Sequence, residues 1–191
     1  MDDHAPPPAG AMPPASLDVF EFARRGDALS GRAALGDFER LAGSLEGIGG
    51  PLDWKAQGEL GPDPEGRPAR WLRLGLRFDA PLQCVRCLET VTLPVDMERR
   101  FKLEQSQEAV EAEPLDEDRY DTILGSPRFD LAGLVEDEAL LALPFSPAHE
   151  DCGLPDGAGR SEDAEAREAL PGRPNPFAAL AALKKTRDGD R

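Results

Sequence analysis

The stretch that decides the fold reads Cys84-Val85-Arg86-Cys87-Leu88-Glu89, and it places two thiols three positions apart between two strand-like runs. Further along the chain, His149 and Cys152 offer an imidazole and a third thiol at the same spacing. The remaining histidine, His4, lies in a proline-rich start. Nearly all the soft metal-ligand side chains therefore fall in two short segments.

These two segments together would supply a Cys3His ligand set, which suits a closed tetrahedral zinc site. The ligands would be Cys84, Cys87, His149 and Cys152. A set of four protein ligands leaves no open coordination position for catalysis, so the predicted zinc is structural. That the two segments meet in space is a hypothesis at this point.

Two other interpretations of Cys84 and Cys87 remain open. The two side chains are compatible with small, buried, hydrophobic residues at the end of a strand. A redox pair is the third interpretation. It is disfavoured because no helix clearly begins at Cys84, and a helix start is what would lower the thiol pKa.

The composition is that of one ordinary acidic domain with tails: 191 residues, 40% hydrophobic, with a net charge of −15. No apolar run approaches the ~20 residues that cross a bilayer, so we expect no membrane contact. The first residues lack the cationic and apolar parts of a secretory signal. The odd number of cysteines argues against a disulfide framework, so we expect the reducing cytoplasm.

The negative charge is concentrated in one part of the chain. Residues 104–171 carry 19 acidic and 4 basic side chains, whereas residues 1–103 carry 16 and 13. Because the front half is close to balanced, the low overall pI does not exclude RNA contact by that half.

The clearest strand pattern covers residues 71–78. Apolar residues occupy every second position, namely Leu72, Leu74, Leu76 and Phe78. They alternate with Trp71, Arg73, Gly75 and Arg77, and this two-residue period is typical of a strand with one buried face. Residues 91–97 alternate in the same way and continue to 103. These two runs flank the cysteine stretch, so we expect an antiparallel pair. Further strands are predicted at residues 29–34, 52–60 and 120–124.

Helices are predicted at residues 37–45 and 131–143, with Asp37 and Asp130 as N-caps. Residues 17–23 fit either a strand or one helical turn. Glu138 falls in the middle of the apolar face of the second helix. A buried carboxylate needs a partner, and we predict a buried charge pair with a sheet arginine, Arg86. Alternatively, Glu138 reaches solvent at the rim of a short helix.

These elements predict a single α+β domain over residues 17–152, with an acidic loop at 104–119. Its sheet is expected to be antiparallel and packed by the two helices, with a small, partly open barrel as an alternative. We expect residues 1–16 to be a disordered leader, 153–174 a flexible linker and 186–191 disordered. Residues 175–185 should form a short docking helix, whose apolar residues are Phe177, Leu180 and Leu183.

Four motifs in this order resemble the YceD family, the large ribosomal RNA subunit accumulation proteins of bacteria and plastids. They are the cysteine stretch, residues 130–144, residues 147–152 and residues 174–180. The resemblance runs from about residue 20 to residue 185. It implies a role in synthesis, processing or stability of large-subunit ribosomal RNA and brings no catalytic residues. The proline-rich leader and the short spacing from His149 to Cys152 depart from the family pattern.

The expected partner is large-subunit ribosomal RNA or its assembly intermediates. The predicted contacts are Arg73, Arg77 and Arg86, with Trp71 available to stack on a base, and the hairpin also offers Arg99, Arg100 and Lys102. The alternative for these residues is an ordinary solvated sheet face. A second hypothesis is an adaptor whose acidic segments hold a basic ribosomal protein. The sequence carries no usual enzyme motif, so a non-enzymatic function is expected.

Overall fold

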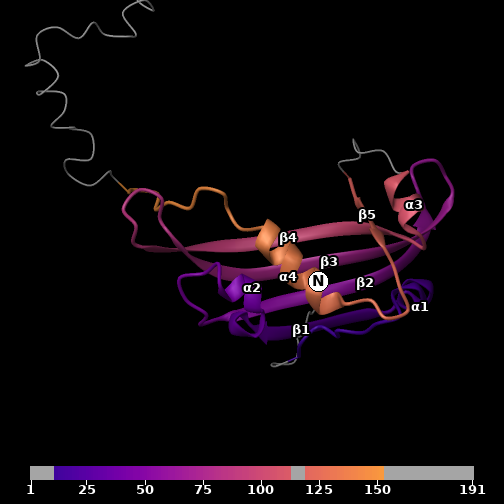
Figure 1. The fold of residues 1–191 in the computed structure, drawn as a ribbon, viewed down its shortest axis with the longest axis horizontal. Coiled ribbons are helices and arrows are strands. Elements are labelled where there is room, and N and C mark those ends of the chain that lie inside the picture. The colour runs from indigo at the N-terminus through magenta and orange to yellow at the C-terminus, as the bar shows by residue number, and fades with distance from the viewer. Residues whose placement is uncertain (1–10, 113–118, 153–191) are drawn as a thin grey trace, which may run out of the picture. The chain divides into compact units, whose positions relative to one another are not determined.

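The computed structural model describes residues 11–112 and 119–152. The described residues up to Asp151 belong to one compact unit, which holds all the helices and strands. Within this unit, helices pack on one sheet (Figure 1), so the predicted α+β class is confirmed.

The sheet has the strand order β1-β2-β3-β4-β5. Its strands are β1 (Ala28–Ala34), β2 (Pro51–Pro62), β3 (Pro68–Gln83), β4 (Thr90–Glu104) and β5 (Asp121–Leu124). The predicted antiparallel arrangement holds from β1 to β4, whereas β5 runs parallel to β4. The connection over residues 105–120 is long enough for the return path that a parallel neighbour requires. The sheet is open, so the barrel alternative is wrong.

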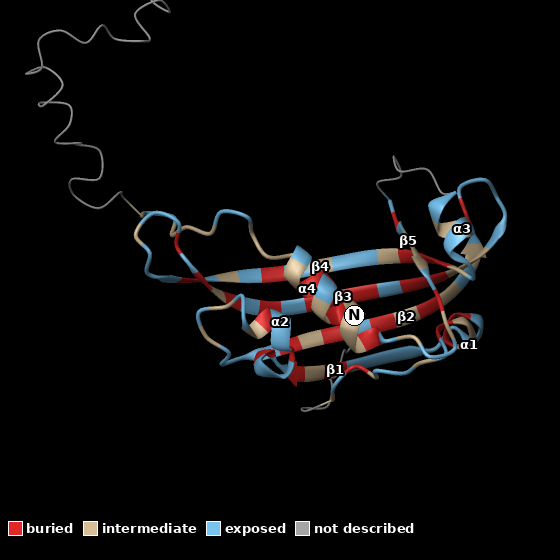
Figure 2. Cartoon of the chain, in the orientation of Figure 1, coloured by how far each residue is buried: buried red, intermediate tan, exposed pale blue. Residues whose placement is uncertain are grey.

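Period two separates the faces of the central strands as predicted. Leu72, Leu74 and Leu76 are buried on the face that carries the helices, and Arg73 and Arg77 lie on the opposite face. Figure 2 shows buried and exposed residues alternating along β2 and β3. Alternation of this kind sets the register, because a shift of one residue would expose every buried side chain.

The first segment of the unit forms helix α1 (Val19–Arg25) rather than a strand. Asp18 caps it by accepting a hydrogen bond from Glu21 N at 3.0 Å, and Gly26 ends it in the left-handed region. The helix lies close to β2 because Gly58 has no side chain: a Cβ there would lie 2.7 Å from Ala23 Cα.

The remaining helices are a 3-10 turn η1 (Leu35–Asp37), α2 (Glu39–Ala42), α3 (Gln107–Glu111) and α4 (Leu131–Leu141). Both predicted helices are thus shorter than expected. Asp130 caps α4 as predicted, whereas the prediction of Asp37 as an N-cap is wrong, because Asp37 ends η1 and Phe38 precedes α2. Arg40 of α2 forms a salt bridge to Glu136 of α4 at 2.8 Å, which joins the two helices on the same side of the sheet. The predicted acidic loop contains α3, whose N-cap is Ser106.

The end of the predicted disordered leader is part of the fold. Ala11 O accepts a hydrogen bond from Trp54 Nε1 at 2.8 Å, and Pro14 O accepts one from Leu131 N at 3.1 Å. Residues 11–16 therefore pack on the domain, because their carbonyl groups satisfy buried donors. The predicted linker at 153–174, the helix at 175–185 and its residues Phe177, Leu180 and Leu183 lie outside the described residues.

Candidate metal centre

The connection between β3 and β4 is a tight turn that buries one sulfur and leaves the other half-buried. Cys84 N donates to Glu89 O at 2.8 Å, and Leu88 N donates to Cys84 O at 3.0 Å. Leu88 adopts φ 65°, the only positive value at a non-glycine residue in the described part of the chain. A leucine in this region costs roughly 1–2 kcal/mol, so the surrounding hydrogen bonds must hold the turn in place.

The chain that follows α4 forms the second half of the centre. Figure 1 shows it running towards the end of the sheet where β3 and β4 are connected. There, Val85 N donates to Pro147 O at 2.9 Å, which joins the two segments through their backbones. Pro144 ends the helical run, because proline cannot donate the next helical hydrogen bond.

His149 is oriented by a backbone carbonyl. Its Nε2 lies 3.2 Å from Thr90 O, and its Nδ1 lies 3.5 Å from Cys87 Sγ. A carbonyl oxygen only accepts, so Nε2 carries the proton and donates to Thr90. The lone pair of a neutral imidazole is then on Nδ1, facing the cysteine. This is the arrangement by which proteins orient histidine ligands to metals.

The four predicted ligands lie together. The side-chain donor atoms of Cys84, Cys87, His149 and Cys152 all lie within 4.8 Å of one another. In a tetrahedron with legs of ~2.3 Å to sulfur and ~2.0 Å to nitrogen, a sulfur–nitrogen edge is about 3.5 Å. The distance from Cys87 to His149 has this value. The donor set therefore could hold a metal ion.

The surroundings of Cys84 favour the deprotonated form of its thiol. Hydrogen bonding to its sulfur from the backbone of Cys87, and then of Arg86, lowers its pKa to about 5, although burial raises it. A thiolate is the form that binds metals and also the form that attacks disulfides. Cys84 is 0% exposed, which closes its sulfur to a thiol or disulfide of another molecule. The imidazole and the third sulfur beside Cys84 and Cys87 complete a zinc ligand set, which favours the metal interpretation over the redox one.

The buried carboxylate of α4 has a different partner from the predicted one. Glu138 is 6% exposed, and its Oε2 lies 3.5 Å from Arg99 Nε of β4, while Arg86 belongs to the cysteine turn. The predicted pair of Glu138 with Arg86 is therefore wrong. Arg99 is two positions from Met97 and from Phe101 along β4, so all three side chains lie on the face under α4. This two-residue spacing is the signal in the sequence that would have identified Arg99 as the partner of Glu138.

The environment of Glu138 disfavours its charge. Burial raises its pKa, and Arg99 only partly offsets this effect. The Oε2 atom has no hydrogen-bond partner, and Arg99 also donates to Asp121 Oδ2 at 2.9 Å. One arginine is thus shared between two carboxylates, which leaves the buried one incompletely compensated.

The residues predicted to contact RNA are held by the sheet itself. Arg73 forms an ion pair with Glu59 at 2.9 Å, and Arg77 forms one with Asp96 at 2.6 Å. Trp71 is 1% exposed, so the prediction that it stacks on a base is wrong. Its position at the covered end of the hairpin, beside Tyr120, buries it. RNA contact by Arg73, Arg77 and Arg86 stays a prediction.

The fold is an open sheet packed by helices, and its longest hairpin, β3–β4, ends in a cysteine turn. This turn faces a histidine and a third cysteine. These features define a small α+β protein with a candidate metal centre. The family model described as "Large ribosomal RNA subunit accumulation protein YceD" matches residues 72–184, so the chain belongs to the YceD family. The resemblance seen in the sequence is confirmed.

A Haemophilus influenzae protein named "Large ribosomal RNA subunit accumulation protein YceD" is 29% identical over 177 residues. The similarity covers 90% of this chain and 96% of that protein. No solved structure matches the chain. In the described part of the chain, none of the helices is long and apolar enough to cross a membrane.

Proposed function

We propose that this chain is a non-enzymatic factor in the synthesis, processing or stability of large-subunit ribosomal RNA. Membership of the YceD family carries the proposal, and the name of the Haemophilus influenzae relative supports it. The matched residues 72–184 include all four donors of the candidate metal centre. The centre and the inferred role therefore belong to the same part of the chain.

A structural role for the metal centre follows from its donors. Three sulfurs and one imidazole are ligands that zinc prefers, and together they fill a tetrahedron without an open position. Such an ion would fasten the β3–β4 turn to residues 147–152. In zinc-finger peptides, binding of this kind contributes ~10–16 kcal/mol to folding, so the metal would strongly stabilise this end of the sheet.

A non-enzymatic role is also supported by two of the buried charged residues, Asp63 and Lys102. Asp63 accepts hydrogen bonds from Arg67 N and Nε at 2.8 and 2.7 Å, and Lys102 Nζ lies 3.5 Å from the same carboxylate. These groups compensate one another and hold the β2–β3 turn. They are committed to structure rather than directed at a substrate.

Depletion of the protein in cells tests the proposed role. Mature large-subunit RNA should fall while small-subunit RNA holds, and the wild-type chain should restore the ratio. A variant with Val85→Ser, at an exposed position of the cysteine turn, should restore it equally. Equal loss of both ribosomal RNAs on depletion would contradict the proposal.

The second candidate function is an adaptor for a basic ribosomal protein. The concentration of 19 acidic side chains in residues 104–171 favours it, because such a segment attracts cationic partners. Pull-downs after nuclease treatment, with and without residues 105–118 and 153–191, separate the two functions. Retention of a basic protein that depends on these segments and survives nuclease supports the adaptor.

A further inference from the structure

Two arginines face each other across the central hairpin. Arg73 of β3 and Arg100 of β4 are register partners, so their side chains leave the sheet on the same face. Like charges directly opposite one another destabilise a sheet. The carboxylate that both reach is Glu59, at 2.9 Å from Arg73 and 3.7 Å from Arg100. Arg73 also lies 3.9 Å from Glu98, which pairs with Lys55 at 2.8 Å. The two carboxylates thus face three cations, Arg73, Arg100 and Lys55, which leaves positive charge at this position.

Arg100 is fixed by an aromatic ring rather than by hydrogen bonds. Its guanidinium carbon lies 3.9 Å from the centre of the Trp71 ring, and Tyr120 packs edge-on against that ring at 5.0 Å. Among the described residues, Arg100 Nε is buried without a hydrogen-bond partner, and Nη2, at 3.7 Å from Glu59, is beyond hydrogen-bond distance of that carboxylate. A guanidinium held in one plane with unused donors is preorganised for an anion, because less side-chain entropy is lost on binding.

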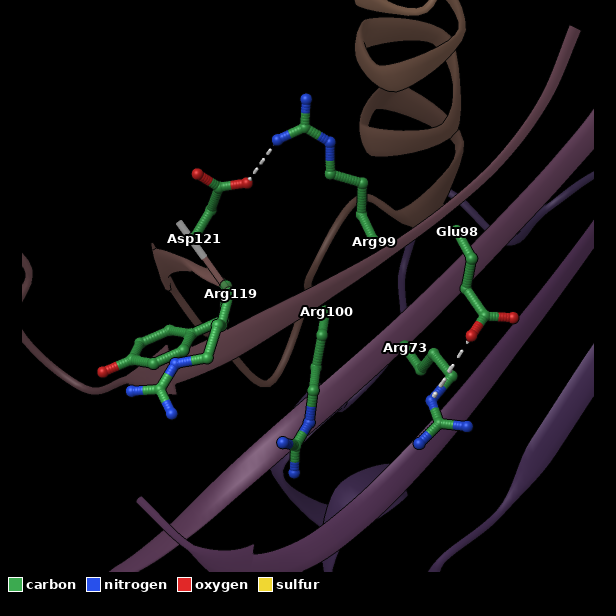
Figure 3. Close-up of a pocket in the computed structure, with 7 residues that line it drawn as sticks. Arg73, Glu98, Arg99, Arg100, Arg119 and Asp121 are labelled. Carbon is green, nitrogen blue, oxygen red and sulfur yellow. Dashed lines mark hydrogen bonds and ion pairs between the residues drawn. The ribbon is translucent and has the colours of Figure 1, made fainter. Parts of the chain in front are cut away.

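These side chains border a groove of about 560 Å³ (Figure 3). It is lined by Arg73, Glu98, Arg99, Arg100, Arg119, Tyr120 and Asp121. Both of its carboxylates are already paired: Asp121 accepts from Arg99 at 2.9 Å, and Glu98 pairs with Lys55 at 2.8 Å and lies 3.9 Å from Arg73 (Figure 3). The groove therefore stays cationic within a chain whose net charge is −15.

We propose that this groove binds a backbone phosphate of RNA between Arg73 and Arg100. The proposal rests on the proposed function and specifies where the RNA is held. Arginine donors match phosphate oxygens in a bidentate geometry. Tyr120, which lines the groove, and Trp71, which lies against Arg100, are both buried, so neither ring offers a face to a base. Recognition is therefore of the backbone, independent of base sequence and strongly dependent on salt.

Fluorescence anisotropy with the full-length chain tests the site. The probe is a labelled single-stranded RNA oligonucleotide from the large-subunit sequence, titrated at about 50 and 200 mM salt. Arg100→Gln should weaken binding roughly tenfold and reduce the slope of log affinity against log salt by about 1. The matched control is Arg32→Gln, since Arg32 lies on the same sheet face, paired with Asp53 at 2.5 Å. It should change affinity less than twofold.

In this assay the proposal is overturned by equal weakening by both variants, by no weakening with Arg100→Gln, or by no RNA binding by the wild-type chain. Arg100→Lys serves as a second variant if Arg100→Gln does not fold. Because lysine keeps the charge but loses the planar fork, it should give an intermediate loss. An oligonucleotide of unrelated sequence should bind equally, and a strong preference for one sequence also counts against backbone recognition.

The cellular assay separates failure of this site from failure of the proposed function. If the wild-type chain restores large-subunit RNA and Arg100→Gln restores it equally, the groove is wrong and the function stands. If depletion leaves large-subunit RNA unchanged, the function itself fails. Nuclease-resistant capture of a basic protein that requires Arg100 would place a protein rather than RNA in the groove and would also overturn the proposal.

Discussion

Cys87 Sγ and His149 Nδ1 lie 3.5 Å apart although 62 positions separate the two residues in sequence. The contact joins the far end of the β3–β4 hairpin to the chain that follows α4. Between them run β4, the acidic loop with α3, β5 and α4. A bond at this point therefore closes a long loop, which is where a cross-link reduces the entropy of the unfolded chain most.

Purified protein should contain close to one zinc ion per chain, measured by elemental analysis. Cys87→Ser should remove most of the metal and lower the unfolding temperature, because one of four ligands is lost. Chelation of the wild-type protein should lower the unfolding temperature to a similar degree. Val85→Ser, in the same turn but exposed, should keep its metal. Metal-free wild-type protein of unchanged stability would refute the centre.

Glu138 and Arg99 should respond to substitution in opposite directions. At pH 7, Glu138→Gln should stabilise the protein by about 0.5–1.5 kcal/mol, since burial raises the pKa of this carboxyl. Arg99→Ala should destabilise it by about 1–2 kcal/mol, because it leaves a buried charge, discounted for the exposure of Arg99. Urea denaturation measures both. Arg77→Ala, which breaks an exposed pair, should change stability by less than about 0.5 kcal/mol.

The pH dependence of this pair has a definite sign. The pKa of the Glu138 carboxyl is higher in the folded than in the unfolded protein. Below the unfolded pKa of about 4.3 its protonation stabilises the fold, and this stabilisation is lost as pH rises through the folded-state pKa. The higher stability of Glu138→Gln relative to the wild-type protein should therefore vanish below about pH 4. An advantage that persists there would mean that the variant acts through packing.

Asp63 should be among the most sensitive surface-turn residues. Burial raises its pKa, but hydrogen bonds from the Arg67 backbone and side chain more than offset this and lower it. Asp63→Ala should cost about 2–4 kcal/mol, because it also leaves Lys102 buried without this partner. Since the pKa is lowered, the contribution is present at neutral pH and is lost as pH falls through the folded value. Glu65→Ala, which removes an exposed carboxylate of the same turn, should be nearly neutral.

Gly58 should not tolerate a methyl group. A Cβ at this position would lie 2.7 Å from Ala23 Cα, so Gly58→Ala must push α1 away from β2 and should cost about 1–3 kcal/mol. Gly49→Ala is the control, because a Cβ there would meet no atom within 4 Å. Thermal unfolding of the two variants should separate them clearly. Equal unfolding temperatures would show that α1 adjusts without cost.

The sequence is most informative where one pattern acts locally. Alternation at residues 71–78 gives the faces of β3 because a strand has period two, and the spacing of Cys84 and Cys87 identifies half of the centre. Both properties depend on neighbours along the chain. The parallel direction of β5 escapes prediction because it depends on the path of a long connection, which leaves no periodic trace.

The partners of charged residues are predicted less well. Arg86 is the expected partner of Glu138 because it lies in the turn, whereas the helix crosses the sheet at the level of Arg99. Trp71 has the parity of the exposed arginines, yet Tyr120, distant in sequence, covers it. The alternation along a strand gives the side of the sheet on which a residue lies. Whether the residue is buried on that side depends on which other segments of the chain pack there, and the sequence of one strand does not encode that packing.

The outer edge of β4 has a consequence for solubility. Because β5 pairs only with Phe101–Glu104, no strand of the described residues covers the rest of that edge. An uncovered edge is a template on which further chains add and polymerise. Here Pro94 removes one backbone donor, and Asp96, Glu98 and Arg99 line the strand with charge of both signs. These residues disfavour the addition of further chains along the uncovered edge of β4.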